Sequence, residues 1–302
     1  MTLQQLKYII EIVNCGSITK ASKNLYISQP SLSSSVKELE SEMGIEIFRR
    51  TPKGITLSAD GSEFLSYARQ IIEQTELLEQ RYRNKKPSKQ LFAVSTQHYS
   101  FAVTAFSNIV SRVDADEYEF TLRETKTYDI IEDVRNFRSE LGILYLNDFN
   151  EKVIRHLLTK SELEFMPLFT ASPHIFISCV HPLATLESVD TEGLADFPFL
   201  TFEQGENNSF YFSEEILSTL PRKKVIHVSD RATLFNLLIG LNGYTLSTGI
   251  LNSDLNGDNI ISVPLKLDES MTIGCIFNPK ARLSSFANQY IDEMKVLLNG
   301  GK

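Results

Sequence analysis

The side chains in this 302-residue chain that could perform covalent chemistry are few and poorly spaced for it. Ser95 and His98 suggest a hydrolase, but the chain has no Gly-x-Ser-x-Gly motif, and its five histidines have no motif spacing. The three cysteines are widely spaced among apolar residues, which favours reduced core thiols over disulfides or a zinc site. Glu214 and Glu215 are expected on a helix, facing apart and solvated. We therefore expect no enzyme activity, no cofactor and no metal.

Residues 28–53 carry side chains that are better suited to bind a partner than to perform covalent chemistry. Small or hydrogen-bonding side chains gather at the start of an expected helix: Gln29, Pro30, Ser31, Ser33, Ser34 and Lys37. Three cations follow within five residues: Arg49, Arg50 and Lys53. Short serines allow a helix to approach base edges in the major groove, and cations contact phosphates. The pattern predicts a DNA-binding surface.

Two short helices joined by a tight turn would position this surface. Gly16 can end a preceding helix, and residues 24–27 can form the turn. Ser28 is a natural N-cap. Pro30 is tolerated in the first helical turn because the N–H that proline lacks would have no partner within the helix there. A buried stripe is predicted at Leu32, Val36, Leu39 and Met43. An ordinary helical hairpin with a solvated polar face is the alternative.

A wing is expected directly after these helices. Residues 47–51 and 55–57 are β-prone runs around a Pro-Lys-Gly turn. The winged helix-turn-helix is therefore predicted to span residues 1–58, and Arg49, Arg50 and Lys53 would contact phosphates.

Residues 59–89 are expected to form a linker helix and hinge. Residues 58–86 contain no proline, and apolar or small residues alternate in steps of four and three at Phe64, Ala68, Ile71, Thr75, Leu78 and Tyr82. This narrow seam favours pairing with a second copy. Packing of the helix on its own body is the alternative.

Charge is divided unevenly along the chain. Residues 1–89 carry 13 Lys and Arg against 10 Asp and Glu, whereas residues 90–302 carry 17 against 28. A basic module joined to an acidic body is typical of a DNA-binding head with a separate domain. No apolar run reaches the length of a membrane span, and no signal peptide is evident, so we expect a cytoplasmic protein.

Strands and helices alternate from residue 90 onward, which predicts an α/β domain with parallel strands. Expected strands include 91–95, 119–124, 141–146, 164–169, 175–180, 199–202, 225–228, 244–248, 260–267 and 271–277. Expected helices are 98–111, 128–137, 209–219, 232–241 and 283–298. Two lobes are predicted, the first at about 90–162 and 268–302 and the second at about 163–267.

Residues 3–72 resemble the N-terminal domain of LysR-type transcriptional regulators. The resemblance rests on GSITKASKNLYISQPSLSSSVKELE and MGIEIFRRTPKGITLSADG. Its landmarks are in register at Ala21, Ser28, Gln29, Pro30, Leu32, Leu39, Glu40, Gly44, Phe48, Arg50 and Gly61. Ile18, Ser34 and Ser35 depart from the residues usual in the family.

The second half resembles the effector-binding domain of the same family at residues 167–169, 181–184, 243–247 and 264–265. This implies a two-lobed α/β domain of the type 2 periplasmic-binding-protein-like fold, with a small-molecule effector between the lobes. It also implies promoter DNA as a partner, a homodimer through the linker helix, a homotetramer, RNA polymerase contact if the protein activates transcription, and no membrane partner.

Effector contacts are expected where strands end, because helix starts there offer N–H groups to anions. The candidates are Ser95, Thr96, Gln97, Thr125, Thr127, Phe202, Gln204 and Thr248. Hydroxyls at helix starts are also ordinary N-caps. We expect a small polar or anionic metabolite, and no arginine is evident among these positions. The alternative function is a small-molecule binding protein or enzyme whose head serves only assembly.

Overall fold

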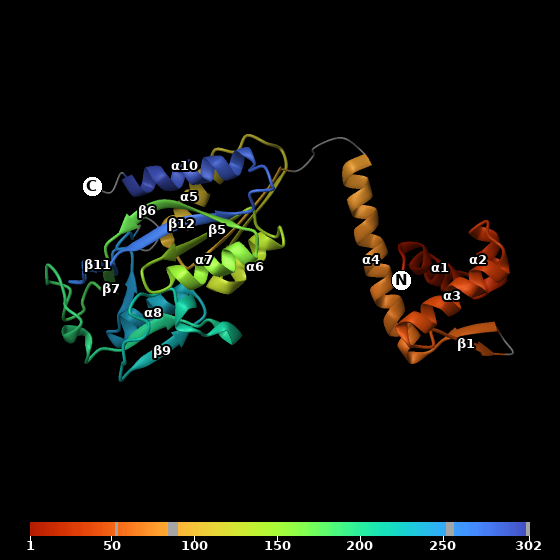
Figure 1. Cartoon of the computed structure of the whole chain (residues 1–302), viewed down its shortest axis with the longest axis horizontal. Coiled ribbons are helices and arrows are strands. Elements are labelled where there is room, and N and C mark those ends of the chain that lie inside the picture. The colour runs from red at the N-terminus through yellow and green to blue at the C-terminus, as the bar shows by residue number, and fades with distance from the viewer. Residues whose placement is uncertain (52–53, 84–89, 252–256, 300–302) are drawn as a thin grey trace. The chain divides into compact units, whose positions relative to one another are not determined.

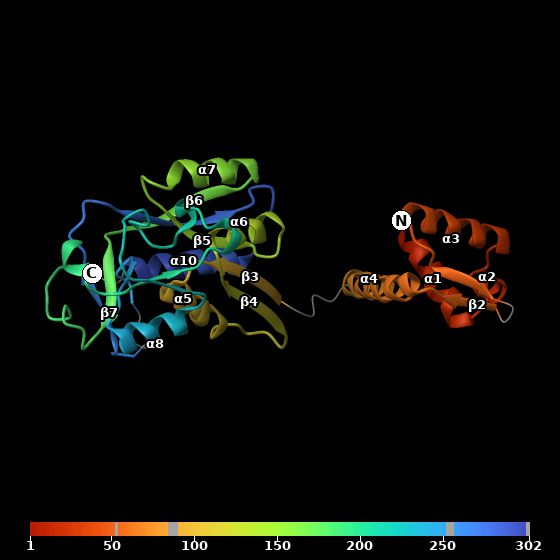
Figure 2. The same cartoon turned by 90° about the horizontal axis from the view of Figure 1, so that it is seen from below.

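The computed structural model describes residues 1–51, 54–83, 90–251 and 257–299. The chain divides into two units, Met1–Ser88 and Lys89–Lys302, which are described separately. Figures 1 and 2 show the two units from two directions. Among the described residues, no helix is both long and apolar enough to cross a membrane.

The first unit is a winged helix-turn-helix, as predicted. It contains α1 (Leu3–Cys15), α2 (Ile18–Asn24), α3 (Gln29–Met43), β1 (Phe48–Thr51), β2 (Gly54–Leu57) and α4 (Ala59–Arg83). The Ser28 side chain accepts from the backbone N–H of Ser31 and so caps α3. Gly16 ends α1 in the left-handed conformation with φ +64°, which favours glycine. The antiparallel strands β1 and β2 form the wing.

The core of the head explains two further residue choices. Leu32, Val36 and Leu39 are buried as predicted, whereas Met43 is exposed at the end of α3. A Cβ atom on Gly61 would lie 2.1 Å from the carbonyl oxygen of Ile47, so only glycine fits at that point of α4. The close approach lets α4 pack directly against the chain entering the wing.

Helix α4 divides its apolar residues between the head and the surface. Ala68 is buried against Leu6 of α1, so it does not belong to an open seam as expected. Tyr67 and Leu78 are 59% and 57% exposed, and Ile71 is also exposed. The side chain of Tyr82, another predicted seam residue, lies outside the described residues.

The first lobe of the second unit is built on a five-stranded sheet in the order β4-β3-β5-β12-β6. These strands are β3 (Gln90–Thr96), β4 (Tyr118–Glu124), β5 (Leu141–Leu146), β6 (Glu164–Ala171) and β12 (Met271–Phe277). Strand β3 is parallel to β4 and β5, and β12 is antiparallel to β5 and β6. The assignment of residues 164–171 to the second lobe is therefore wrong, because β6 pairs with β12.

Helices cover both faces of this sheet (Figure 1). Helices α5 (Ser100–Val110) and α10 (Ser285–Asn299) pack together on one face. Helices α6 (Thr127–Arg135) and α7 (Glu151–Lys160) pack on the other. Along β5, Ile143 belongs to the first cluster and Leu144 to the second, as the two-residue period of a strand requires. Helix α7 was not predicted.

The second lobe contains a three-stranded sheet, β10-β7-β11, and a parallel pair, β8-β9. Its elements are β7 (His174–Ser178), η1 (Glu192–Leu194), β8 (Phe199–Phe202), η2 (Gly205–Asn207), η3 (Phe210–Phe212), β9 (Val225–Val228), α8 (Arg231–Leu241), β10 (Thr245–Ser247) and β11 (Ile260–Pro264). The helix predicted at residues 209–219 is wrong. Only the short η3 forms there, because Glu214 and Glu215 turn inward to partners elsewhere in the fold.

Candidate nucleic-acid interface and interlobe site

The polar face of α3 lies opposite its buried stripe. The exposed members of the predicted set are Gln29, Pro30, Ser31, Ser34 and Lys37, and Ser33 is half-buried. Gln29 Nε2 donates to Ser33 Oγ at 2.9 Å, and Ser34 Oγ donates to Glu38 at 3.1 Å. These bonds stay on the helix surface, so the same groups could exchange them for a partner's acceptors and donors.

Two of the predicted wing cations, Arg49 and Arg50, lie on β1. Arg49 is exposed, and its Nε lies 3.2 Å from Glu46 Oε2. An exposed pair of this kind is weak and easily exchanged. Lys53 and the side chain of Arg50 lie outside the described residues. Glu40 Oε1 accepts from the backbone N–H groups of Ile47 and Phe48, at 2.8 and 3.0 Å, and so ties the start of the wing to α3.

In the second unit, Gln97 joins the ends of two strands to a helix start. Its Nε2 donates to Thr127 Oγ1 at 2.6 Å, and its Oε1 accepts from Tyr99 Oη at 2.9 Å and from the Tyr145 N–H at 3.1 Å. The residue is buried. Gln97 and Thr127, two predicted effector residues, are therefore brought together within the first lobe.

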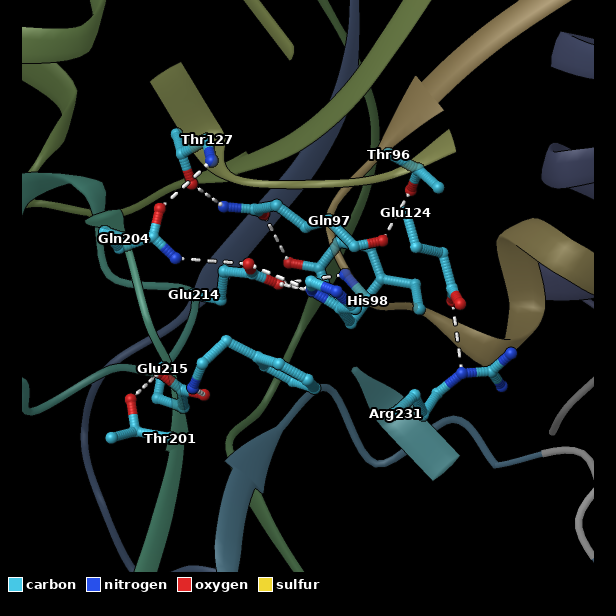
Figure 3. Close-up of polar contacts among 12 residues, drawn as sticks. Thr96, Gln97, His98, Glu124, Thr127, Thr201, Gln204, Glu214, Glu215 and Arg231 are labelled. Atoms are coloured by element: carbon cyan, nitrogen blue, oxygen red, sulfur yellow. Dashed lines mark hydrogen bonds and ion pairs between the residues drawn. The ribbon is translucent and has the colours of Figure 1, made fainter. Parts of the chain in front are cut away.

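Side chains from the second lobe complete this network (Figure 3). Gln204 Oε1 accepts from the Thr127 N–H at 3.1 Å, and Gln204 Nε2 donates to Glu214 Oε1 at 3.2 Å. Glu214 also accepts from the His98 N–H at 2.9 Å and contacts the His98 Nδ1 at 2.9 and 3.0 Å. The His98 ring stacks on Phe202 with centroids 3.9 Å apart. The predicted residues Phe202 and Gln204 therefore meet the first lobe directly.

The other predicted effector residues support loops. Ser95 Oγ donates to Asp133 at 2.7 Å, and Thr96 Oγ1 donates to the Gln97 carbonyl at 2.8 Å. The Thr125 N–H donates to the Thr96 carbonyl at 2.9 Å. Buried Thr248 accepts from the Ile250 N–H at 3.4 Å. None of these four predicted residues lines the cavity that lies between the lobes beside Phe202.

This cavity has a free volume of about 30 Å³, which is room for a water molecule or two. Phe202 is the predicted residue that lines it. Arg231 also lines it, contrary to the sequence expectation, and its Nε lies 3.1 Å from Glu124 Oε1. The hydroxyl of Thr245, which is 4% exposed and lines the same cavity, has no hydrogen-bond partner among the described residues.

The pKa values of three titratable groups in the crevice, Glu215, His98 and Glu124, are raised. Burial, together with the charge of Glu214, raises the pKa of Glu215 to about 7, although Thr201 and the Phe202 N–H donate to it. Burial opposes the charged ring of His98, but hydrogen bonding to Glu214 and its charge give a net rise in the His98 pKa. Burial raises the pKa of Glu124 despite the neighbouring arginine.

Several residues of this site were missed or misplaced in the sequence analysis. The interpretation of Glu214 and Glu215 as a solvated face is wrong, because both are buried. Glu124 is the last residue of β4, and Arg231 is the first residue of α8, shortly after β9 ends. Both could therefore have been predicted as site residues from their positions near strand ends. No local pattern indicates that Glu214 faces the first lobe, since its partner His98 is 116 residues away.

Cysteines and metal ligands add little to the site. Cys275 is buried as expected of a core thiol, whereas Cys179 is exposed, contrary to expectation. No group of three or more His, Cys, Asp or Glu that could hold a metal ion occurs within the described residues.

Comparison with known proteins covers nearly the whole chain. The model described as bacterial regulatory helix-turn-helix protein, lysR family, matches residues 3–62, and the LysR substrate binding domain matches residues 104–297. The uncharacterized HTH-type transcriptional regulator YeiE of Escherichia coli (strain K12) is 23% identical over 295 residues, or 97% of this chain and 96% of that protein.

Two further comparisons concern the N-terminal head and the fold of the whole chain. The nitrogen assimilation regulatory protein nac of Klebsiella aerogenes is 42% identical over 76 residues, which is 25% of each protein. The crystal structure of PA01 protein from Pseudomonas aeruginosa, which carries a LysR-family assignment, has a TM-score of 0.50 at 22% identity and 99% coverage of both chains. At that identity the likeness concerns the fold.

Proposed function

This chain belongs to the LysR family of bacterial transcriptional regulators, and we propose that it binds promoter DNA through the polar face of α3 and the β1-β2 wing. The observation that carries this proposal is the division of α3 into two faces. Leu32, Val36 and Leu39 are buried, while Gln29 and Lys37 on the other face are exposed. The major groove admits a helix, and the residues at its start meet base edges.

Roles for the individual residues follow from their chemistry. We propose that bases are contacted by Gln29, Pro30, Ser31, Ser33, Ser34 and Lys37, and phosphates by Arg49, Arg50 and Lys53. Gln29 can pair with an adenine through both atoms of its amide once it leaves Ser33. Arg49 has an exposed pair with Glu46 that it can exchange for a phosphate.

A mobility-shift titration on the DNA next to the protein's own gene, with excess random competitor, tests these roles. Arg49→Ala should weaken binding to all sequences and reduce the slope of log affinity against log salt by about 1. Gln29→Ala should cost about 1–3 kcal/mol on the specific site and relax the preference at one base position. Lys160→Ala, an exposed cation in the acidic unit, is the matched control. Equal losses on specific and random DNA would count against Gln29 as a base reader.

An assembly role for the head, with the body acting as a binding protein or enzyme, is the second candidate. We propose instead that the chain is not an enzyme. Ser95 donates to Asp133, while the His98 ring faces Glu214, so the two residues do not form a nucleophile and base pair. Salt separates the candidates, because contacts to phosphates weaken steeply with salt and assembly without DNA does not require such contacts.

Oligomers would form through α4. Tyr67, Ile71 and Leu78 expose apolar surface along one face of this helix, which supports pairing with a second copy. Two heads joined in this way match a two-fold symmetric operator. We propose a dimer through α4, a homotetramer made of two such dimers as the family resemblance implies, contact with RNA polymerase if the protein activates, and action in the cytoplasm.

The effector is proposed to be a small molecule bound between the two lobes. Gln97, Thr127, Phe202 and Gln204 frame the crevice, while Ser95, Thr96, Thr125 and Thr248 are proposed to act by holding its loops. A ligand with different contacts in the open and closed arrangements would shift the lobe equilibrium and alter how the oligomer presents its heads to DNA. A ligand that binds yet leaves operator affinity and DNA bending unchanged would contradict this mechanism.

A further inference from the structure

The Glu214 carboxylate lies between the lobes, where this fold is suited to hold an anion. Parallel strands β3 and β4 end at this edge of the sheet, and helices α5 and α6 begin there. Helix starts leave backbone N–H groups without intrahelical partners and attract negative charge. Neither Tyr99, the N-cap of α5, nor Lys126, the N-cap of α6, makes a side-chain cap bond. Both positions are therefore open to acceptors from elsewhere.

Acceptors from the second lobe lie at the start of α6 and beside the start of α5, where His98 precedes the N-cap (Figure 3). Glu214 accepts from the His98 N–H just before α5, and Gln204 accepts from the Thr127 N–H at the start of α6. The Gln204 amide also donates to Glu214. The two side chains thus form one hydrogen-bonded unit that spans the crevice.

The surroundings of Glu214 match those of a bound carboxylate. Donors come from the His98 N–H, the His98 ring and Gln204 Nε2, at 2.9 to 3.2 Å. The side chain is only 4% exposed, and a buried charge requires such partners. The His98 ring is held flat against Phe202, so the donor group is oriented in advance.

Little space remains beside this carboxylate. The cavity of about 30 Å³ has an apolar part and a polar part. Its apolar lining residues are Phe176, Phe202, Leu234, Phe235, Leu246 and Ile250, and its polar ones include Tyr99, Ser100, Glu215 and Ser247. Within the described part of the chain, the buried Thr245 hydroxyl that lines the cavity lacks a hydrogen-bond partner. An unpaired buried hydroxyl is unfavourable, so it points to a ligand that would pair with it. Arg231 Nε lies 3.1 Å from Glu124 Oε1, so this arginine already faces a carboxylate of the first lobe.

We propose that Glu214 is a resident carboxylate that occupies the anion site of the effector domain in cis and holds the two lobes together without a bound ligand. The ligand it exchanges with is a small monocarboxylate whose apolar body reaches toward Thr245. Such a ligand would replace a contact that links the lobes and thereby gain the differential affinity that shifts their equilibrium. This inference rests on the proposed function, because it takes the interlobe crevice as the effector site.

Acetate is the probe that tests the proposal, used on the full-length chain. Glu214→Ala should vacate a carboxylate-sized space beside intact donors. Sodium acetate should then raise the unfolding midpoint of this variant saturably relative to sodium chloride at equal ionic strength. The wild-type midpoint should be the same in the two salts. By titration calorimetry, acetate should bind the variant about ten-fold or more tighter than the wild type. The reason is that the buried donors of His98 and Gln204 have lost the Glu214 carboxylate that they bind in the wild type.

Two matched variants serve as controls. Glu203→Ala removes a 50% exposed carboxylate that pairs with Lys126 at 3.4 Å across the same crevice, and acetate should have no specific effect on it. Glu214→Gln fills the site with a neutral side chain of the same shape, so acetate should not bind. In this variant the His98 pKa, followed by NMR, should fall because the charge that raises it is gone.

An acetate response that is equal in wild type, Glu214→Ala and Glu203→Ala overturns the proposal. If Glu214→Ala does not fold, the Glu214→Gln titration decides, and an unchanged His98 pKa overturns the proposal. Operator binding is measured on the same preparations. Loss of the acetate result with intact DNA binding rejects only this inference, whereas a wild-type protein that does not bind DNA rejects the proposed function.

Discussion

Replacement of Glu215 by glutamine should remove much of the pH dependence of the acidic unit's stability. Glu215 is 1% exposed, and its pKa is raised from 4.5 to about 7 by burial and by the neighbouring carboxylate. A carboxyl group with a raised pKa in the folded state holds its proton between pH 4.5 and 7, while the unfolded chain releases it. Its stabilising effect is therefore present below pH 4.5 and is lost as pH rises through 7.

The size of this loss follows from the two pKa values. At 1.36 kcal/mol for each pKa unit, the raised pKa corresponds to about 3 kcal/mol by pH 8. Glu215→Gln keeps an acceptor for the Phe202 N–H and stays neutral. The variant should match the wild type below pH 4.5 and unfold roughly 6 to 12 °C higher at pH 8.

Calorimetric unfolding of the full-length chain at several pH values provides the assay. Protonation of His98 has the same sign, because its raised pKa stabilises the fold below pH 6.5 and that stability is lost as pH rises through the folded value. The variant should therefore keep a shallow slope from this histidine. Glu203→Gln, at an exposed position, is the control. A wild-type-minus-variant difference that does not change between pH 5 and pH 8 would refute the reasoning.

Three further predictions concern the head and linker. Gly61→Ala should destabilise the head by roughly 1–3 kcal/mol, because the new Cβ would meet the Ile47 carbonyl at 2.1 Å; thermal unfolding checks this. Glu40→Ala leaves the Ile47 and Phe48 N–H groups without their acceptor and should cost about 1–3 kcal/mol, with faster hydrogen exchange at the wing. Leu78→Glu should weaken dimers in sedimentation equilibrium with little change in monomer helicity, because this side chain is exposed in the monomer.

Local rules suffice for most of the head. Ser28, Pro30 and Gly16 act on the backbone within three residues of their own positions, so the helix-turn-helix and its start and stop positions could be predicted. Met43 was predicted to be buried but is exposed, because the apolar periodicity of α3 continues beyond the point where the core ends. The DNA contacts themselves stay predictions.

The interlobe site was only partly predictable for a different reason. Strand ends indicated Gln97 and Thr127 as effector residues, and the structure brings the two side chains together at one edge of the sheet, while their role stays a prediction. Glu214 depends on a contact with His98, 116 residues earlier, that overrides the helix expected from local propensity. Such a tertiary contact leaves no trace in the residues on either side of it. Likewise, β6 joined the first lobe only because β12 returns to pair with it.

The central claim is that this chain recognises particular DNA sequences through its head. The most direct measurement is selection of fragmented genomic DNA from the source organism by the purified full-length protein, followed by sequencing of the bound fragments. We expect a small number of discrete sites that share a two-fold symmetric motif, and loss of these peaks for the double variant Gln29→Ala with Arg49→Ala. Uniform coverage of the genome by folded, dimeric protein would contradict it.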